Sequence, residues 1–421
     1  MITIKKRGLE NSPLYYWLIV LFCMNFLGRG SIVCTVFAIF TLFKLPRKTT
    51  LDMGAVFTLL LSVAAFFSSM VHYDMIEAIK SLNFFLLYYI GLNGYYASSD
   101  KAAFLKKTVF AIFAGYAFLV LLTLISNLNG ERASGNRLII TNVWTGEKLA
   151  TTLVGLLSSV VIGYFFYALV CQKKKGTKVC AIAALVVVLV LNAATATRTP
   201  FFLLAINLLV MSGLYLLNQR GRNAIRVLAI LLAVIVIAAI LIAADAFGIR
   251  SAIEESPIFL RLLESGTNTS RGEIMKNHFR YMLDYPWGGY QIAEAVGRQA
   301  HNFLQQGYDY YGVFATVPLL IIGISFLRNM AVLAGTKRKI GIDYLLFSMY
   351  LTMLIQACLE PVFTGYPCFM FSFLLIHGMA NAYLKTRSGE LGENRADQYG
   401  PLRKHGADHA ADGPAGQNVG A

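Results

Sequence analysis

The chain has 421 residues, of which 57% are hydrophobic and only 14% are charged. Soluble domains average about 25% charged residues, so this composition excludes a soluble globular protein, a disordered chain and a coiled coil. In so apolar a chain the net charge of +15 is typical of basic loops that orient a membrane protein, and it does not indicate nucleic-acid binding.

Twelve apolar segments are candidates for membrane-spanning helices, which need about 20 largely apolar residues. In chain order they are 14–27, 31–45, 51–70, 82–97, 108–126, 151–170, 179–194, 200–217, 227–245, 308–327, 344–358 and 368–383. Three of them are short, so eleven or thirteen spans stay open as alternatives. The basic residues before the first segment resemble a signal peptide, but no cleavage site of small residues follows, and we interpret the segment as an uncleaved helix. The sequence predicts an all-α polytopic membrane protein.

Lysine and arginine are unevenly distributed over the loops. With the N-terminus in the cytoplasm, the cytoplasmic segments hold 25 Lys and Arg residues and the outer segments hold 12, six of them in one long loop. Basic residues favour the cytoplasmic side, so we predict that both termini are cytoplasmic. Residues 388–421 have no apolar period and predict a disordered cytoplasmic tail after a membrane domain of residues 1–387.

The long outer loop, residues 246–302, contains helix signals of its own. A connection of this length seldom persists in a compact protein without a function. Ser270 and Glu273 form a capping-box pattern at the start of an expected helix over 271–284. Arg271 lies in the first turn, where free backbone N–H groups favour an anion. The alternative is a solvated first-turn arginine, which the pattern alone favours.

Two further residues suggest chemistry at the outer face. His301 precedes the tenth expected span, and imidazole is readily poised as a general base near neutral pH. The alternative is an interfacial histidine that bonds to a neighbouring loop. Arg198 lies in a tight turn between two strongly apolar segments, with no acid close to it in the sequence. A charge at this depth usually has a function, and the alternative is an arginine that extends to the lipid headgroups.

Acidic residues are scarce in the expected spans, because Asp245, Asp343 and Glu360 all lie at span ends. Proton-coupled transporters tend to bury carboxylates near the membrane midplane. This pattern favours chemistry on an anionic substrate over transport. A flippase for lipid-linked oligosaccharides, or another transporter, is the alternative, and two similar halves of the sequence would indicate it. The six cysteines form no CxxC pair and have no histidine at metal-ligand spacing, so we expect no zinc site.

These features together resemble the superfamily of O-antigen ligases and bacterial polysaccharide polymerases. The resemblance covers about residues 132–327 and rests on the number of spans, the Thr197-Arg198 turn and the outer loop. The loop contains Ser270-Arg271, then Tyr285-Pro286-Trp287-Gly288-Gly289, and closes with His301-Asn302. The family commonly has a Pro-x-x-Gly-x-Gly turn where this chain has Pro286-Trp287-Gly288-Gly289, and this departure affects the acceptor side.

The resemblance implies an inverting glycosyltransferase of the bacterial cytoplasmic membrane that needs no metal and no other cofactor. Its donor would be a polyprenyl-diphosphate-linked glycan, and its acceptor a glycan or a lipid in the membrane. By this resemblance Arg198 and Arg271 bind the diphosphate, and His301 takes the proton from the acceptor hydroxyl. The further expected substrate contacts are Arg132, Tyr290 and Asn302. The motifs do not separate a ligase from a polymerase.

Overall fold

The computed structural model describes residues 9–46, 48–133, 137–218, 254, 271–363 and 366–398. The chain forms two compact units, Met1–Ala382 and Tyr383–Ala421. The only strands of the described part are β1 (Arg132–Ala133) and β2 (Arg137–Leu138), which pair antiparallel, and its other regular elements are helices. The predicted all-α class is therefore confirmed for these residues.

Nine helices in the described ranges are long and apolar enough to cross a membrane. They are α3 (Met53–His72), α4 and α5 together (Met75–Ala97), α6 (Lys101–Asn127), α7 (Thr151–Val170), α8 (Lys175–Ala194), α9 (Thr199–Asn218), α16 (Val313–Gly335), α17 (Gly341–Leu359) and the first part of α18 (Pro367–Gln398). Each of the nine overlaps one span that the sequence predicts. The expected span 227–245 lies outside the described residues, so the total of twelve stays a prediction.

The two N-terminal helices are shorter than the sequence predicts. α1 covers Pro13–Cys23 and α2 covers Gly30–Leu42. At a rise of about 1.5 Å per residue, neither helix reaches the roughly 30 Å of a membrane's hydrocarbon core. Between them the chain reverses in the short helix η2 (Phe26–Gly28), where Asn25 and Leu27 adopt left-handed backbone angles, with φ of 50° and 54°. Non-glycine residues rarely adopt these angles, which is why the sequence predicted longer helices here.

Burial separates central helices from peripheral ones. α7 and α17 pack against each other, and 89% and 83% of the residues in their spans are buried. In α8 and α9 only 28% of the span residues are buried. The central pair therefore contacts protein on most sides, whereas α8 and α9 leave most of their apolar surface for lipid.

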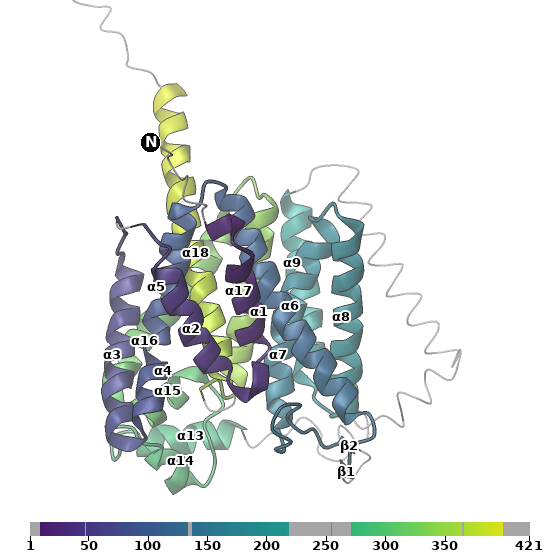
Figure 1. The fold of residues 1–421 in the computed structure, drawn as a ribbon, viewed down its shortest axis with the longest axis vertical. Coiled ribbons are helices and arrows are strands. Elements are labelled where there is room, and N and C mark those ends of the chain that lie inside the picture. The colour runs from purple at the N-terminus through teal and green to yellow at the C-terminus, as the bar shows by residue number, and fades with distance from the viewer. Residues whose placement is uncertain are drawn as a thin grey trace, which may run out of the picture. The chain divides into compact units, whose positions relative to one another are not determined.

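Successive helices run in alternate directions, so the connections gather at two ends of the first unit (Figure 1). One end holds the α2–α3, α5–α6, α7–α8 and α16–α17 connections. The other holds β1, β2, the α8–α9 turn, the α17–α18 connection and the short helices α13 (Arg271–Tyr281), α14 (Gln291–Val296) and α15 (Phe303–Tyr311). We call this second end the candidate-site end, because every predicted site residue belongs to one of its elements.

The helix α18 continues to Gln398 and so extends into the second unit. The sequence predicted a disordered tail from residue 388 onward. Residues 388–398 are instead helical, and residues 399–421 lie outside the described ranges.

An apolar groove of about 670 Å³ lies between α1 and α6. Trp17, Phe110 and Phe118 line it, with Glu10 and Lys107 among its polar residues. Ser99, in the α5–α6 connection, donates a hydrogen bond from Oγ to Oε1 of Glu10 at 2.6 Å. The polar part of the groove therefore lies at the opposite end of the unit from the candidate-site end.

Candidate functional site

The short helix α15 is separate from the spanning helix that follows it. The sequence predicted a span over 308–327, but α15 ends at Tyr311, and Gly312 adopts φ 77° and ψ −174° before α16 begins at Val313. A Cβ atom on Gly312 would lie 2.7 Å from the carbonyl oxygen of Pro286. The predicted start of this span is therefore wrong, because a glycine conformation and a close backbone contact break the helix after Tyr311.

Three polar side chains of α15 each hold a neighbouring segment. Gln305 Nε2 donates to the backbone carbonyl of Met275 in α13 at 2.9 Å. Gln306 Oε1 accepts two backbone N–H groups of the α17–α18 connection, both at 2.7 Å. Asp309 Oδ1 accepts two backbone N–H groups at the start of α14, at 3.0 and 3.2 Å. One helix thus fixes α13, α14 and the end of α17 relative to one another.

Asn302 caps the N-terminus of α15. Its Oδ1 accepts the backbone N–H of Gln305 at 2.8 Å, and its Nδ2 donates to Oε1 of Gln305 at 2.5 Å. Asparagine is among the preferred N-cap residues. The side chain that the sequence predicted to contact substrate is therefore engaged in positioning the start of α15, directly after His301.

His301 lies opposite a buried acid. Its Nδ1 is 3.8 Å from Oε2 of Glu360, the residue that ends α17. The side chain of Glu360 is 1% exposed and that of His301 is 27% exposed. This separation is within ion-pair range and longer than a hydrogen bond, and catalytic contacts are often long before substrate binds. The carboxylate occupies the Nδ1 side of the ring, so Nε2 is the nitrogen that can take a proton from a substrate.

Arg198 belongs to a turn that two helices hold in place. Thr197 donates its backbone N–H to the carbonyl of Asn192 at 2.9 Å, and Ala196 adopts a left-handed conformation with φ 54°. The side chain of Asn192 donates to Oγ of Ser158 on α7 at 2.8 Å. The side chain of Arg198 is half-buried, and its backbone carbonyl accepts the N–H of Phe201 in the first turn of α9.

The Arg198 turn and His301 approach successive turns of α17. A Cβ atom on Gly155 of α7 would lie 3.0 Å from Nε2 of Gln356 and 3.7 Å from Cγ2 of Thr197, so these three residues meet. Gln356 lies one turn before Glu360, whose backbone N–H donates to its carbonyl at 3.0 Å. Through Gln356 and Glu360, two segments far apart in the sequence reach the same end of one helix.

The other predicted residues lie on separate elements. Arg271 is the first residue of α13, and its side chain and the expected cap Ser270 lie outside the described part. Tyr290 precedes α14 with φ 68°, and burial raises the pKa of its hydroxyl. Arg132 is exposed on β1, opposite Leu138. The structure thus brings Arg198 and His301 toward α17, whereas Arg132 belongs to β1 and Tyr290 to the start of α14.

Sequence reasoning missed a buried acid beside a buried histidine. Asp309 and His278 are each 1% exposed. Burial raises the pKa of Asp309, while backbone hydrogen bonds and the nearby His278 act in the opposite direction. Among the described residues, Oδ2 of Asp309 and Nε2 of His278 have no hydrogen-bond partner. Two glutamines and an aspartate within five residues were the signal that this segment is too polar to begin a span.

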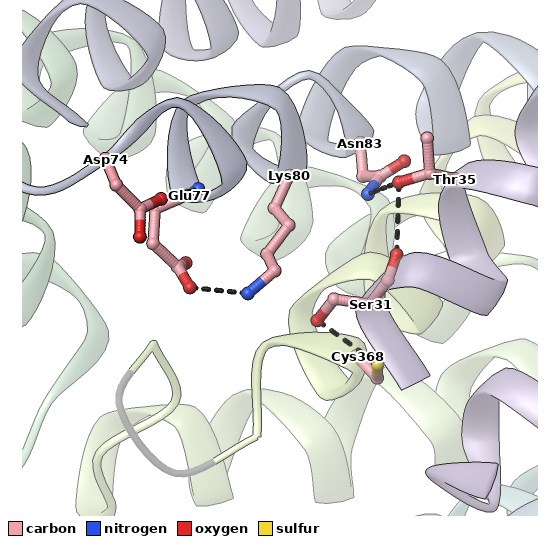
Figure 2. A network of polar contacts seen from close by, with 7 residues as sticks. All are labelled: Ser31, Thr35, Asp74, Glu77, Lys80, Asn83 and Cys368. Carbon is pink, nitrogen blue, oxygen red and sulfur yellow. Dashed lines mark hydrogen bonds and ion pairs between the residues drawn. The ribbon is translucent and has the colours of Figure 1, made fainter. Parts of the chain in front are cut away.

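A further polar group lies on α4 (Met75–Ser81) at the same end (Figure 2). Asp74 caps this helix by accepting the backbone N–H of Glu77 at 2.8 Å. Lys80 Nζ lies 2.5 Å from Oε1 of Glu77, and both side chains extend from the same side of α4 in Figure 2. Beside them Ser31 contacts Cys368 at 3.9 Å, which joins the start of α2 to the start of α18. Lys80 and Glu77 therefore add an ion pair to the candidate-site end.

No protein-family model matches the chain, and no curated protein matches it either. A functional assignment therefore depends on the residues and their geometry.

Proposed function

We propose that the protein is a glycosyltransferase that acts on the outer face of a bacterial cytoplasmic membrane and transfers or polymerises a polyprenyl-diphosphate-linked oligosaccharide. The observation that carries the proposal is the approach of the His301–Glu360 pair and the Arg198 turn to successive turns of α17. A base with a buried acid beside it and a nearby cation are the groups that hydroxyl attack on such a donor requires.

In the proposed reaction, an acceptor hydroxyl attacks the anomeric carbon of the donor glycan. His301 takes the hydroxyl proton as the new carbon–oxygen bond forms. The bond between the anomeric carbon and the diphosphate oxygen breaks, and the lipid diphosphate leaves with the bonding electrons. Arg198 and Arg271 stabilise the charge that develops on this leaving group, and Glu360 stabilises the imidazolium that His301 becomes. A single displacement inverts the anomeric centre.

Exposed aromatic side chains near the site support a substrate whose diphosphate lies at the headgroup boundary of the membrane. Trp287 and Phe314 are 64% and 68% exposed, and their ring centroids lie 5.9 Å apart. Exposed tryptophan is typical of the boundary between headgroups and water. The polyprenyl tail of the donor would lie in the lipid, with the diphosphate at headgroup level, where the Arg198 turn and the end of α17 meet.

The proposal is tested by turnover of a polyprenyl-diphosphate-linked oligosaccharide by the purified protein with EDTA present, with products separated by size. We expect the wild type to lengthen the glycan or move it to an added acceptor. We expect Arg198→Ala, Arg271→Ala and His301→Ala to lose turnover while staying folded. Arg280→Ala is the matched control, since Arg280 is exposed on α13. Full turnover by Arg198→Ala or His301→Ala would contradict the proposal.

The orientation of the site is tested by labelling with a membrane-impermeant thiol reagent in intact cells. Glu147→Cys replaces an exposed residue at the candidate-site end, and Lys174→Cys replaces one in the α7–α8 connection. We expect reaction at position 147 above the wild-type background and none at position 174 until the membrane is permeabilised. The reverse result would place the candidate-site end in the cytoplasm and exclude an outer-face transferase.

A second candidate function, movement of a lipid-linked oligosaccharide across the membrane, is favoured by a polar network inside the bundle. Its members are Asp52, Tyr88, Asn329, Tyr350, His377 and Asn381. Tyr88 donates to Asp52 at 2.9 Å, and Tyr350 Oη lies 2.5 Å from Nδ1 of His377. Ionisable groups inside spans often mark a transport path. The test uses vesicles that contain the purified protein. This candidate would be favoured if the wild type moved the donor lipid between leaflets without changing the size of its glycan, and if His377→Gln lost that movement.

A further inference from the structure

Gln356 has a fully buried amide with unused hydrogen-bonding capacity. Its side chain is 0% exposed. Within the described ranges of the chain, neither its Oε1 nor its Nε2 has a hydrogen-bond partner. Buried polar groups nearly always have a partner, and each exception needs an explanation, such as a catalytic or binding role. Leaving both ends of an amide unsatisfied destabilises the fold, so a purely structural role does not explain this residue.

The position of Gln356 indicates what its amide faces. The amide nitrogen lies against Gly155, and Thr197, the residue before Arg198, approaches the same glycine. One turn further along α17, Glu360 contacts His301. In the proposed reaction Arg198 binds the diphosphate and His301 binds the acceptor hydroxyl. The group between them is the donor sugar that carries the anomeric carbon.

The chemistry of an amide narrows the ligand further. Oε1 accepts hydrogen bonds and Nε2 donates them. A phosphate oxygen only accepts, so a phosphate would leave Oε1 without a partner. A sugar hydroxyl both donates and accepts, and so does an acetamido group. The unmet donor and acceptor of Gln356 together match one of these two groups.

We propose that Gln356 is a sugar-binding subsite, and that its amide recognises a hydroxyl or acetamido group on the first sugar of the lipid-linked donor. This inference rests on the proposed transferase function. Gly155 lets α7 approach the amide closely, since a Cβ atom there would meet Nε2 at 3.0 Å. A site that hydrogen-bonds a substrate group discriminates against analogues that lack it, so Gln356 selects which sugar is transferred.

The test compares binding of two probes to purified protein: polyprenyl diphosphate without sugar, and the polyprenyl-diphosphate-linked oligosaccharide. Gln356→Met keeps the length of the side chain and removes both polar atoms. We expect this variant to bind the glycan-bearing probe about tenfold more weakly, as for one lost hydrogen-bonding group, and to bind the sugar-free probe as the wild type does. Its thermal unfolding midpoint should be equal to or above that of the wild type, because the unsatisfied groups are gone.

Gln356→Asn keeps the amide on a side chain that is shorter by one methylene, and it replaces the methionine variant if that variant does not fold. We expect it, too, to weaken binding of the glycan-bearing probe and to leave binding of the sugar-free probe unchanged. Equal weakening of both probes would assign the amide to the diphosphate and overturn the sugar subsite. Unchanged binding of both probes, with a lower unfolding midpoint, would also overturn it, because it indicates a buried water in a structural role.

Binding does not require turnover, so the two proposals can fail separately. If the wild type transfers glycan and Gln356→Met binds both probes normally, only the sugar subsite is wrong. If the wild type binds the glycan-bearing probe through Gln356 but transfers nothing, the subsite stands and the transferase proposal fails. If the wild type binds neither probe, both fail.

Discussion

Nδ1 of His301 lies 3.8 Å from Oε2 of Glu360, and this contact joins the segment before α15 to the end of α17. A carboxylate that is 1% exposed is costly to bury without compensating contacts. Gln306 accepts the backbone N–H groups of Val362 and Phe363, just after Glu360. Asn302, the residue after His301, caps the start of α15. The approach of His301 and Glu360 is therefore built by hydrogen bonds within and from α15.

Replacing Glu360 by glutamine tests whether this acid positions the base. We expect Glu360→Gln to lower kcat by at least about 10-fold, and by less than the roughly 10⁴-fold that follows neutralisation of an acid hydrogen-bonded to a catalytic histidine, with little change in KM. Glu273→Gln is the control, because Glu273 is exposed on α13 at the same end. A higher KM with unchanged kcat would show that Glu360 binds substrate and does not act through His301.

Asn302 allows a test of capping against substrate contact. Loss of its hydrogen bond to Gln305 in Asn302→Ala should lower the free energy of unfolding by about 1 kcal/mol. Asn302→Ser keeps a capping oxygen, so we expect both stability and kcat/KM near the wild-type values, measured by thermal unfolding and by turnover. If the serine variant is stable but inactive, the amide of Asn302 contacts substrate as the sequence predicted.

The spans were readable from the sequence because lipid imposes a composition on any segment that crosses it. All nine described spans coincide with apolar runs. The start of α16 was predicted too early, since the aromatic residues Tyr308, Tyr310 and Tyr311 run directly into the next apolar segment and outweighed the polar signal of Asp309. Their separation depends on the conformation of Gly312 and its contact with Pro286, and both are tertiary features.

Some residues of the candidate site could be predicted from the sequence, and others depend on tertiary contacts. His301 and Arg198 were found because a histidine and an arginine are conspicuous beside apolar segments. Glu360 and Gln356 were not assigned to the site, because their roles depend on which residues of the loop and of the α8–α9 turn reach α17. A single sequence holds no signal for such a contact, whereas the N-cap pattern of Asn302 before α15 is local and was available.

Two glycines with similar φ differ in ψ and in steric contact: Gly297 has ψ 10°, in the left-handed helical region, whereas Gly312 has ψ −174°, in a region that essentially only glycine adopts. Gly297 has φ 72°, and within the described structure no atom lies within 4 Å of a Cβ built on it. Gly312 has φ 77°, and its Cβ would meet the Pro286 carbonyl at 2.7 Å. We expect Gly297→Ala to cost about 1 kcal/mol of unfolding free energy and Gly312→Ala to cost clearly more, as measured by thermal unfolding. Equal losses would mean that neither the ψ of Gly312 nor its contact with the 286–288 segment adds to the cost.

The buried Asp309 predicts a pH dependence of stability. Burial raises its pKa above the ordinary value of 3.8, so the folded protein holds this proton more tightly than the unfolded chain. The stabilising contribution of the protonated group is complete below pH 3.8 and is lost as the pH rises through the raised pKa. His278 on α13 and Glu294 on α14 face this carboxyl and act in opposite directions, with His278 lowering its pKa and Glu294 raising it.

Asp309→Asn keeps an oxygen for the two backbone N–H groups of α14 and carries no charge at any pH. We therefore expect the unfolding midpoint of the wild type to fall relative to that of Asp309→Asn as the pH rises from roughly 4 to 7. Asp284→Asn is the control, because Asp284 is exposed after α13 and its replacement should give a nearly constant difference. A constant difference for Asp309→Asn as well would mean that the carboxyl keeps its ordinary pKa, and that the α14–α15 contact does not depend on its protonation.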